Sequence, residues 1–165
     1  MMRIFITTIT LILTTFCFAQ STIPEVLEKL NKKSVPYITV NELQIKNKYV
    51  LLDTREIKEF NVSHIKNSIN IGYDKFDAQK VTSIVKDKNA LIVVYCSIGV
   101  RSEKIGENLF KLGYKKVFNL YGGIFEWKNK GGIVVDNKNE ITENIHTFSK
   151  KWSIYLKKGN QIYEE

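Results

Sequence analysis

The sequence predicts an α/β fold built around a parallel β-sheet. Between Tyr37 and Leu120, short apolar runs alternate with polar stretches of helical character, which is typical of strand–helix–strand crossover units. The run Leu91–Tyr95 has the continuous apolar character of a strand that is buried on both faces. A hydrophobic content of 44% and a charged content of 25% match a globular protein and exclude a largely disordered, collagen-like or multi-span membrane chain. The length of 165 residues suits one domain with short appendages.

The charge balance is basic but does not identify a partner. Lysine and arginine together number 25 against 17 acidic residues, which gives a net charge of +8. This balance favours anionic surroundings and specifies no fold. The lysines are scattered, and no recognition-helix or base-stacking motif accompanies them, so we expect no nucleic-acid partner.

The N-terminus has the pattern of a secretory signal peptide. After Arg3 an uncharged stretch runs from Ile4 to Phe18, and Cys17 and Ala19 provide small residues at the positions that a signal peptidase inspects. The stretch is shorter than the ~20 apolar residues of a spanning helix. We therefore predict a signal peptide at residues 1–19, cleavage after Ala19, export to the periplasm or the medium of a bacterium, and no membrane span afterwards.

Two other interpretations of this segment stay open. It could be retained as an anchor, or Cys17 could carry a lipid. A lipidation site would require a small residue before the cysteine, whereas Phe16 is large. The lipoprotein interpretation is therefore the weaker one.

Removal of residues 1–19 leaves Cys96 as the single cysteine of a chain bound for an oxidising compartment. An internal disulfide is then impossible, and one cysteine with two histidines cannot form a structural zinc cluster. We expect no metal and no cofactor. An unpaired cysteine in an exported protein is either an inert buried side chain or a reactive centre.

The elements follow one another in a simple order. Ser21–Pro24 is a helix-start signal, and the apolar spacing that follows predicts an N-terminal helix. Five strands are predicted at Tyr37–Val40, Tyr49–Asp53, Ser68–Ile71, Leu91–Cys96 and Lys116–Leu120. Helices are predicted between them at Asn41–Ile45, Arg55–Phe60, Phe76–Val85 and Ser102–Leu112, and glycine pairs break the chain before and after Ile124–Asn129. The helix Ser102–Leu112 is the clearest, because an apolar stripe ends at Gly113, a typical C-terminal cap.

The C-terminal segment has the pattern of an amphipathic helix. Ile145, Phe148, Trp152 and Tyr155 recur at intervals of three and four residues. We expect this helix to pack on the core, although docking to a partner or to a membrane surface would use the same pattern. The predicted organisation is a signal peptide at 1–19, an N-terminal helical segment at 20–35, a domain at 36–135 and a C-terminal amphipathic helical extension at 136–165.

Cys96 ends the most apolar strand, and the loop Ser97–Val100 leads directly into a helix. Ligands of open α/β sheets collect at the carboxyl ends of strands, where helix N-termini present free N–H groups. Backbone donors, the helix dipole and Arg101 would favour the thiolate of a cysteine whose reference pKa is about 8.5. Gly99 permits backbone angles that turn amides inward. A plain strand–helix turn with a buried Cys96 remains the alternative from position alone.

The arginines point to the same edge of the sheet. Of the 25 basic residues only three are arginines, and the two that follow the signal peptide, Arg55 and Arg101, both come after predicted strands. A planar, forked guanidinium suits oxyanions and carboxylates better than lysine does. We expect both arginines to bind such groups.

From about Tyr37 to Val135 the chain resembles the rhodanese-like sulfurtransferase domain. Four motifs carry the resemblance in order: Leu51–Glu56 with Glu59–Phe60, His64–Ile65 with Ser68–Ile71, Tyr95–Ser102, and Leu120–Gly123 with Trp127. The resemblance implies a three-layer fold, with a five-stranded parallel sheet and helices on both faces. It also implies a cysteine that carries transferable sulfur as a persulfide.

The resemblance assigns roles residue by residue. Cys96 matches the sulfur-accepting nucleophile. The residues Ser97, Ile98, Gly99, Val100, Arg101 and Ser102 match the loop and helix start that hold the outer sulfur and an anionic donor. Asp53 and Arg55 match positions that order the pocket, and His64 matches a supporting residue in a turn rather than a general base.

The implied activity moves sulfur from thiosulfate or a persulfide to cyanide, a small thiol or a protein thiol, and we expect a monomer. Two alternatives remain. One is a non-catalytic rhodanese-like module that binds proteins. The other is a phosphatase or arsenate-reducing activity, which is less compatible with the sequence because four residues separate Cys96 and Arg101, whereas related phosphatases have five.

Overall fold

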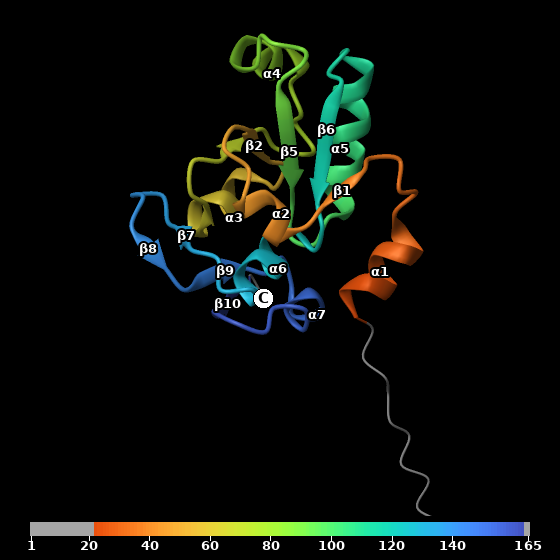
Figure 1. Cartoon of the computed structure of the whole chain (residues 1–165). Coiled ribbons are helices and arrows are strands. Elements are labelled where there is room, and N and C mark those ends of the chain that lie inside the picture. The colour runs from red at the N-terminus through yellow and green to blue at the C-terminus, as the bar shows by residue number, and fades with distance from the viewer. Residues whose placement is uncertain (1–21, 164–165) are drawn as a thin grey trace, which may run out of the picture.

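The computed structural model describes residues 22–163, and its centre is a five-stranded parallel sheet (Figure 1). The strand order is β1-β6-β5-β2-β4. The bounds are β1 Tyr37–Ile38, β2 Val50–Asp53, β4 Ile69–Asn70, β5 Leu91–Tyr95 and β6 Lys116–Leu120. All five lie within predicted strands, so the predicted α/β fold with a five-stranded parallel sheet is confirmed. The predicted signal peptide, residues 1–19, lies outside the described residues.

Alternation along the central strands divides the core into two layers. Val93 of β5 belongs to one cluster of buried side chains, whereas its neighbours Ile92 and Val94 belong to the other. Successive strand residues point to opposite faces, so each cluster covers one face of the sheet. Because both faces are covered, β5 is apolar throughout, as its sequence predicts.

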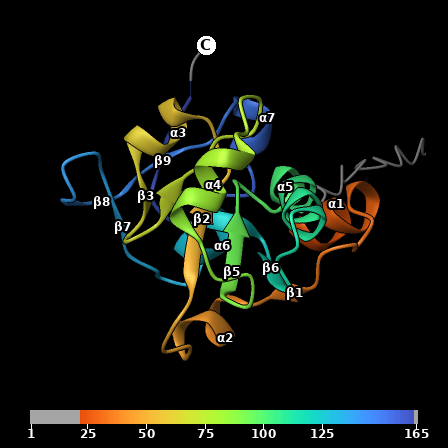
Figure 2. The ribbon, with the colours of Figure 1, turned by 90° about the horizontal axis from the view of Figure 1, so that it is seen from above.

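Helices cover both faces, as Figure 2 shows along the strands. On one face, α4 (Ala78–Ile84) and α5 (Val100–Lys111) contribute to the cluster that contains Ile92. On the other face lie α2 (Val40–Gln44) and α6 (Gly123–Asn129), and side chains of α1 (Ile23–Leu30) join the same cluster. The chain after α1 is tied to α5, because Glu103 accepts hydrogen bonds from two backbone amides of that segment.

A small antiparallel sheet flanks the main one. It consists of β3 (His64–Ile65), β7 (Val134–Val135) and β8 (Ile141–Thr142), and α3 (Ile57–Val62) directly precedes it. Strand β7 follows α6, and its pairing with β3 attaches this part of the chain to the domain.

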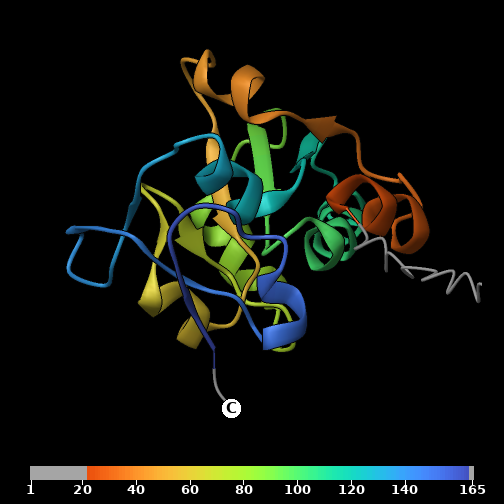
Figure 3. The ribbon, with the colours of Figure 1, turned by 90° about the horizontal axis from the view of Figure 1, so that it is seen from below.

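The prediction of one amphipathic helix near the C-terminus is wrong. The segment instead forms β9 (Asn144–His146), the short helix α7 (Lys150–Ser153) and β10 (Asn160–Ile162), and it lies across the underside of the domain in Figure 3. Strands β9 and β10 pair in parallel, and the amide of Thr147 donates to the Ile162 carbonyl at 2.7 Å. Phe148 has φ +65°, which no α-helix contains.

The reason is non-local pairing. An isolated helix of this length is marginal in water, so contacts with distant residues decide its structure. The apolar spacing shows the periodicity of the side chains, but it does not show that residues 144–146 pair with the strand Asn160–Ile162. Within residues 22–163 no helix is both long enough and apolar enough to span a membrane.

Candidate active site

Cys96 lies directly after β5, where the chain turns into α5. The loop ends at Gly99, which has φ +113° and precedes the first residue of the helix. This left-handed conformation is one that glycine adopts without strain. The Gly99 carbonyl accepts hydrogen bonds from the side-chain amides of Asn31 at 2.9 Å and Asn119 at 2.8 Å. The side chains of Asn31 and Asn119, which lie outside the loop, therefore fix its conformation.

Polar donors surround the sulfur of Cys96. The Gly99 amide donates to Sγ at 3.1 Å, and the Ser102 hydroxyl lies 3.6 Å from it. The same hydroxyl lies 2.7 Å from Oδ1 of Asn119, so its single proton serves one acceptor at a time. The expected inward-facing amide is present at Gly99, and the thiol is not enclosed by apolar groups alone.

These contacts favour the thiolate. Burial opposes ionisation of Cys96, but the charge of Arg101, the Ser102 hydroxyl and the amides of Ser102 and Gly99 together outweigh it. The pKa of Cys96 is consequently lower than the ordinary value of a thiol. A thiolate is the nucleophilic form of cysteine, so this position can support covalent chemistry.

Backbone amides at the start of α6 form hydrogen bonds with the backbone of Cys96 and Ser97. The amide of Ile124 donates to the Cys96 carbonyl at 2.9 Å, and that of Phe125 donates to the Ser97 carbonyl at 3.1 Å. Gly123 has φ +54°, and a Cβ there would lie 2.3 Å from the Cys96 carbonyl oxygen. This close approach requires glycine, so the second residue of the Gly122–Gly123 pair serves the active-site loop.

Arg101 is held by a carboxylate that the sequence did not single out. Its two terminal nitrogens each donate to one oxygen of Glu59 at 2.7 Å, and one of them also reaches the Ser97 hydroxyl at 3.1 Å. Burial opposes ionisation of Glu59, but the hydrogen bonds and charge of Arg101 keep its pKa below the ordinary value of 4.5. Glu59 thus fixes the guanidinium beside the thiol.

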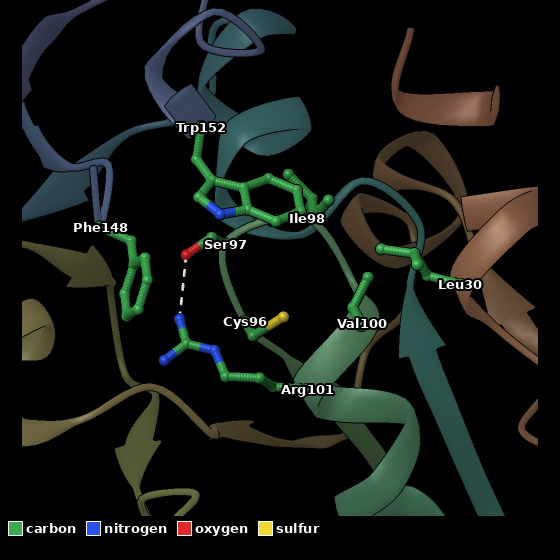
Figure 4. Close-up of a pocket in the computed structure, with 8 residues that line it drawn as sticks. All are labelled: Leu30, Cys96, Ser97, Ile98, Val100, Arg101, Phe148 and Trp152. Atoms are coloured by element: carbon green, nitrogen blue, oxygen red, sulfur yellow. Dashed lines mark hydrogen bonds between the residues drawn. The ribbon is translucent and has the colours of Figure 1, made fainter. Parts of the chain in front are cut away.

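A pocket of about 220 Å³ opens above the thiol (Figure 4). The sulfur of Cys96 points into it, and only 2% of the residue is exposed, so reactants reach the sulfur through this pocket. The lining residues are Leu30, Cys96, Ser97, Ile98, Val100, Arg101, Phe148 and Trp152. The walls are therefore mostly apolar, with the thiol and Arg101 as the reactive and charged groups.

The structure separates the predicted site residues into two groups. Cys96, Ser97, Ile98, Val100 and Arg101 line the pocket. Gly99 and Ser102 contact the sulfur from beneath.

The other predicted residues lie outside the pocket lining. Arg55 is completely buried, with its Nε and one terminal nitrogen on Asp53 and a further bond to the Ser63 carbonyl at 2.7 Å. His64 is buried in β3, with Nδ1 3.1 Å from the Phe60 carbonyl and its ring stacked on Phe60. The pKa of His64 is lowered, first by burial, which suits a neutral structural imidazole. Arg55 and Asp53 therefore hold the chain at the end of β2, His64 holds the start of β3, and none of the three lines the pocket.

Sequence reasoning missed four functional candidates. Glu59 occurs in a quoted motif but received no role. Phe148 and Trp152 are expected to pack on the core, and Leu30 belongs to the apolar spacing of the N-terminal helix; neither pattern gives a sign that these residues lie near Cys96. Among residues 22–163 no group of three or more histidine, cysteine, aspartate or glutamate side chains is arranged to hold a metal ion.

Comparison with known families gives one match. The model of the rhodanese-like domain matches residues 38–130 of this chain. The match lies within the segment that the sequence predicts as the central domain, and it covers the thiol, Arg101 and Glu59.

Individual relatives show the same domain in different contexts. Thiosulfate sulfurtransferase GlpE of Coxiella burnetii is 28% identical over 107 residues, which cover 65% of this chain and 97% of that protein. A tRNA uridine(34) hydroxylase of Hamiltonella defensa is 30% identical over 129 residues, 76% of this chain, and the chain spans about a third (34%) of its length. Among solved structures, a rhodanese-related protein from Thermoplasma volcanium has 31% identity and a TM-score of 0.53, covering 61% of this chain and 97% of that one.

Proposed function

The chain belongs to the rhodanese-like domain family, and from this premise we propose that it is a sulfurtransferase acting through a persulfide on Cys96. The donor is thiosulfate or a persulfide, and the acceptor is cyanide or a thiol, including the thiol of another protein. The observation that carries the proposal is the Cys96 thiol of lowered pKa, which the Gly99 amide holds and which lines the pocket.

The reaction has two displacement steps at sulfur. The Cys96 thiolate attacks the outer sulfur of the donor, an S–S bond forms, and the bond within the donor breaks with its electron pair on the departing sulfite or thiolate. An acceptor nucleophile then attacks the outer sulfur of the persulfide, and the electron pair of the broken S–S bond returns to Cys96. Both steps conserve electrons, and ping-pong kinetics are expected.

The surrounding residues have supporting roles. The amide of Gly99 and the hydroxyl of Ser102 stabilise the thiolate that attacks in the first step and leaves in the second. Arg101 provides a positive charge beside the sulfur, and Glu59 holds it in place.

Intact mass spectrometry tests the proposal. Exposure to thiosulfate, and separately to inorganic polysulfide, is expected to add one sulfur atom that cyanide removes. Cys96→Ser is the matched control, because a hydroxyl replaces a thiol of similar shape and the fold is retained. It should gain no sulfur and show no thiosulfate:cyanide turnover, with a thermal unfolding midpoint close to the unsubstituted protein. Sulfur uptake by the serine variant, or none by the native chain from either donor, would refute the assignment.

We further propose that the protein works as a monomer outside the cytoplasm. The support for export is the N-terminal sequence pattern alone. An N-terminal sequence beginning at Gln20 in protein recovered from the periplasm or the medium is the expected result, and an intact residue 1 would contradict cleavage.

A further inference from the structure

Three apolar side chains of the pocket come from outside the segment that matches the family model. Leu30 is the last residue of α1, whereas Phe148 and Trp152 belong to the C-terminal segment around α7. The family match ends at residue 130. Figure 4 shows these three side chains around the opening above Cys96. The segments before and after the matched domain therefore contribute part of the pocket wall.

The charge of Arg101 is already balanced at this pocket. Both terminal nitrogens donate to Glu59, whose side chain is completely buried, and one also donates to Ser97. The ring of Phe148 lies 5.5 Å from the guanidinium carbon. An anionic group in the pocket would meet a cation that is already paired with Glu59 and lies near the ring of Phe148, so Arg101 attracts it less than an unpaired arginine would.

Phe148 is held at the mouth in a conformation that costs free energy. It has φ +65°, which is unfavourable for a bulky side chain, and it is 52% exposed. Its amide donates to Nδ1 of His146 at 3.1 Å, and hydrogen bonds of Thr147 and Ser149 fix the turn on both sides. The fold thus keeps a large apolar ring in water beside the pocket, where a ligand could cover it.

We propose that the sulfur partner of Cys96 is an organic thiol, or the persulfide of such a thiol, with a compact, uncharged apolar body. This proposal rests on the sulfurtransferase activity proposed above. The body packs against Leu30, Phe148 and Trp152 while its sulfur meets Cys96. A volume of about 220 Å³ is below the ~300–1,000 Å³ of sites for drug-sized ligands, so the body is a short alkyl chain or a single ring.

The transfer step balances without another reactant. The thiolate of the partner attacks the outer sulfur of the Cys96 persulfide and a new S–S bond forms. The bond between Sγ and the outer sulfur breaks, and its electron pair leaves on Sγ. The proton on the outer sulfur stays there, so the products are the organic persulfide and the Cys96 thiolate. With an organic persulfide as donor the same step runs in reverse.

A single-turnover competition tests this substrate class. Full-length protein is loaded with inorganic polysulfide, freed of excess reagent and mixed with 2-phenylethanethiol or 2-mercaptoethanesulfonate at equal thiolate concentration. Each rate is divided by the rate at which the same thiol reacts with a small-molecule persulfide. This division corrects for the different intrinsic nucleophilicities of the two thiols. The corrected ratio is expected to favour the apolar thiol by at least roughly tenfold, the discrimination that apolar pockets typically reach.

Substitutions in the apolar wall formed by Leu30, Phe148 and Trp152 test whether this wall causes the preference for the apolar thiol. Phe148→Gly removes the ring and also relieves the positive φ, so the variant should fold, and the ratio should fall roughly tenfold. Phe148→Leu retains an apolar wall and should retain most of the preference. Leu30→Lys adds a cation at the pocket and should shift the ratio roughly tenfold toward the sulfonate. Ile45→Lys adds the same charge at the end of another helix, at a position 78% exposed and outside the pocket, and should leave the ratio unchanged.

The outcomes separate the two proposals. If neither thiosulfate nor polysulfide adds sulfur to Cys96, the sulfurtransferase assignment fails. If Cys96 is loaded but the native protein prefers neither thiol, or if Phe148→Gly and Leu30→Lys leave the ratio unchanged, the apolar substrate class is overturned and the activity stands.

Discussion

Two arginine–carboxylate pairs lie near the carboxyl ends of neighbouring strands and differ in what they do. Arg55 and Asp53 are two residues apart in sequence, and both side chains are completely buried. Arg101 and Glu59 are 42 residues apart, and the Arg101 side chain, which lies beside the thiol, is 20% exposed. Both pairs place guanidinium donors on carboxylate oxygens, as the rarity of arginine in this chain predicts.

The difference shows that the same interaction can stabilise a fold or tune a site. The buried pair has no access to the pocket, and Arg55 also binds the Ser63 carbonyl, so it joins β2 to the chain before β3. The second pair leaves Arg101 lining the pocket, where its charge lowers the pKa of Cys96 against the opposing effect of burial. Its position next to the reactive group, rather than its chemistry, gives it a functional role.

Removal of Arg55 should have the largest effect on stability. Arg55→Ala leaves the carboxylate of Asp53 buried without its partner, and breaking such a pair typically costs roughly 3–5 kcal/mol. Urea unfolding monitored by circular dichroism measures the loss. If Arg55→Ala lost less free energy of unfolding than Arg101→Ala, the distinction between a structural pair and an active-site pair would be contradicted.

Removal of Arg101 should cost less stability but change the thiol. Arg101→Ala exposes Glu59 to the pocket, so we expect a loss of roughly 1–3 kcal/mol. It also removes the charge that lowers the pKa of Cys96, so the midpoint of iodoacetamide alkylation should move to higher pH. The native midpoint should lie below the ordinary value of about 8.5. An unchanged midpoint in a folded variant would exclude Arg101 as the cause.

Neutralising Glu59 should have the smallest effect, with a defined pH dependence. Because the folded-state pKa of Glu59 is lowered, its stabilising contribution is complete above the ordinary value of 4.5 and is lost as the pH falls through the lowered value. Glu59→Gln should therefore be less stable than the native protein by about 1 kcal/mol near pH 7. The two proteins should converge below pH 4.5 in unfolding experiments. A difference that grows on acidification would reverse the sign of this argument.

The prediction of the sheet succeeded because its signals are local. The continuous apolar run of β5 and the stripe of α5 each follow from a few adjacent residues, and the observed bounds differ by no more than a few positions. Cys96 is at the predicted junction, and Gly99 has a positive φ, a backbone conformation that glycine permits. The failure concerned Ile145–Tyr155, where an equally regular apolar spacing belongs to a strand, a turn and a short helix.

From the sequence alone, the strands, the loop between Cys96 and Arg101 and the rarity of arginine could be established, because each depends on neighbouring residues or on composition. Only the tertiary structure decided that Arg101 binds Glu59 and that Leu30, Phe148 and Trp152 surround the thiol. These contacts join segments far apart in the chain, and their free energy depends on burial and on the charges brought close together. No local spacing of residues contains that information, so the positions of the thiol and of Arg101 were predictable while the apolar wall around them was not.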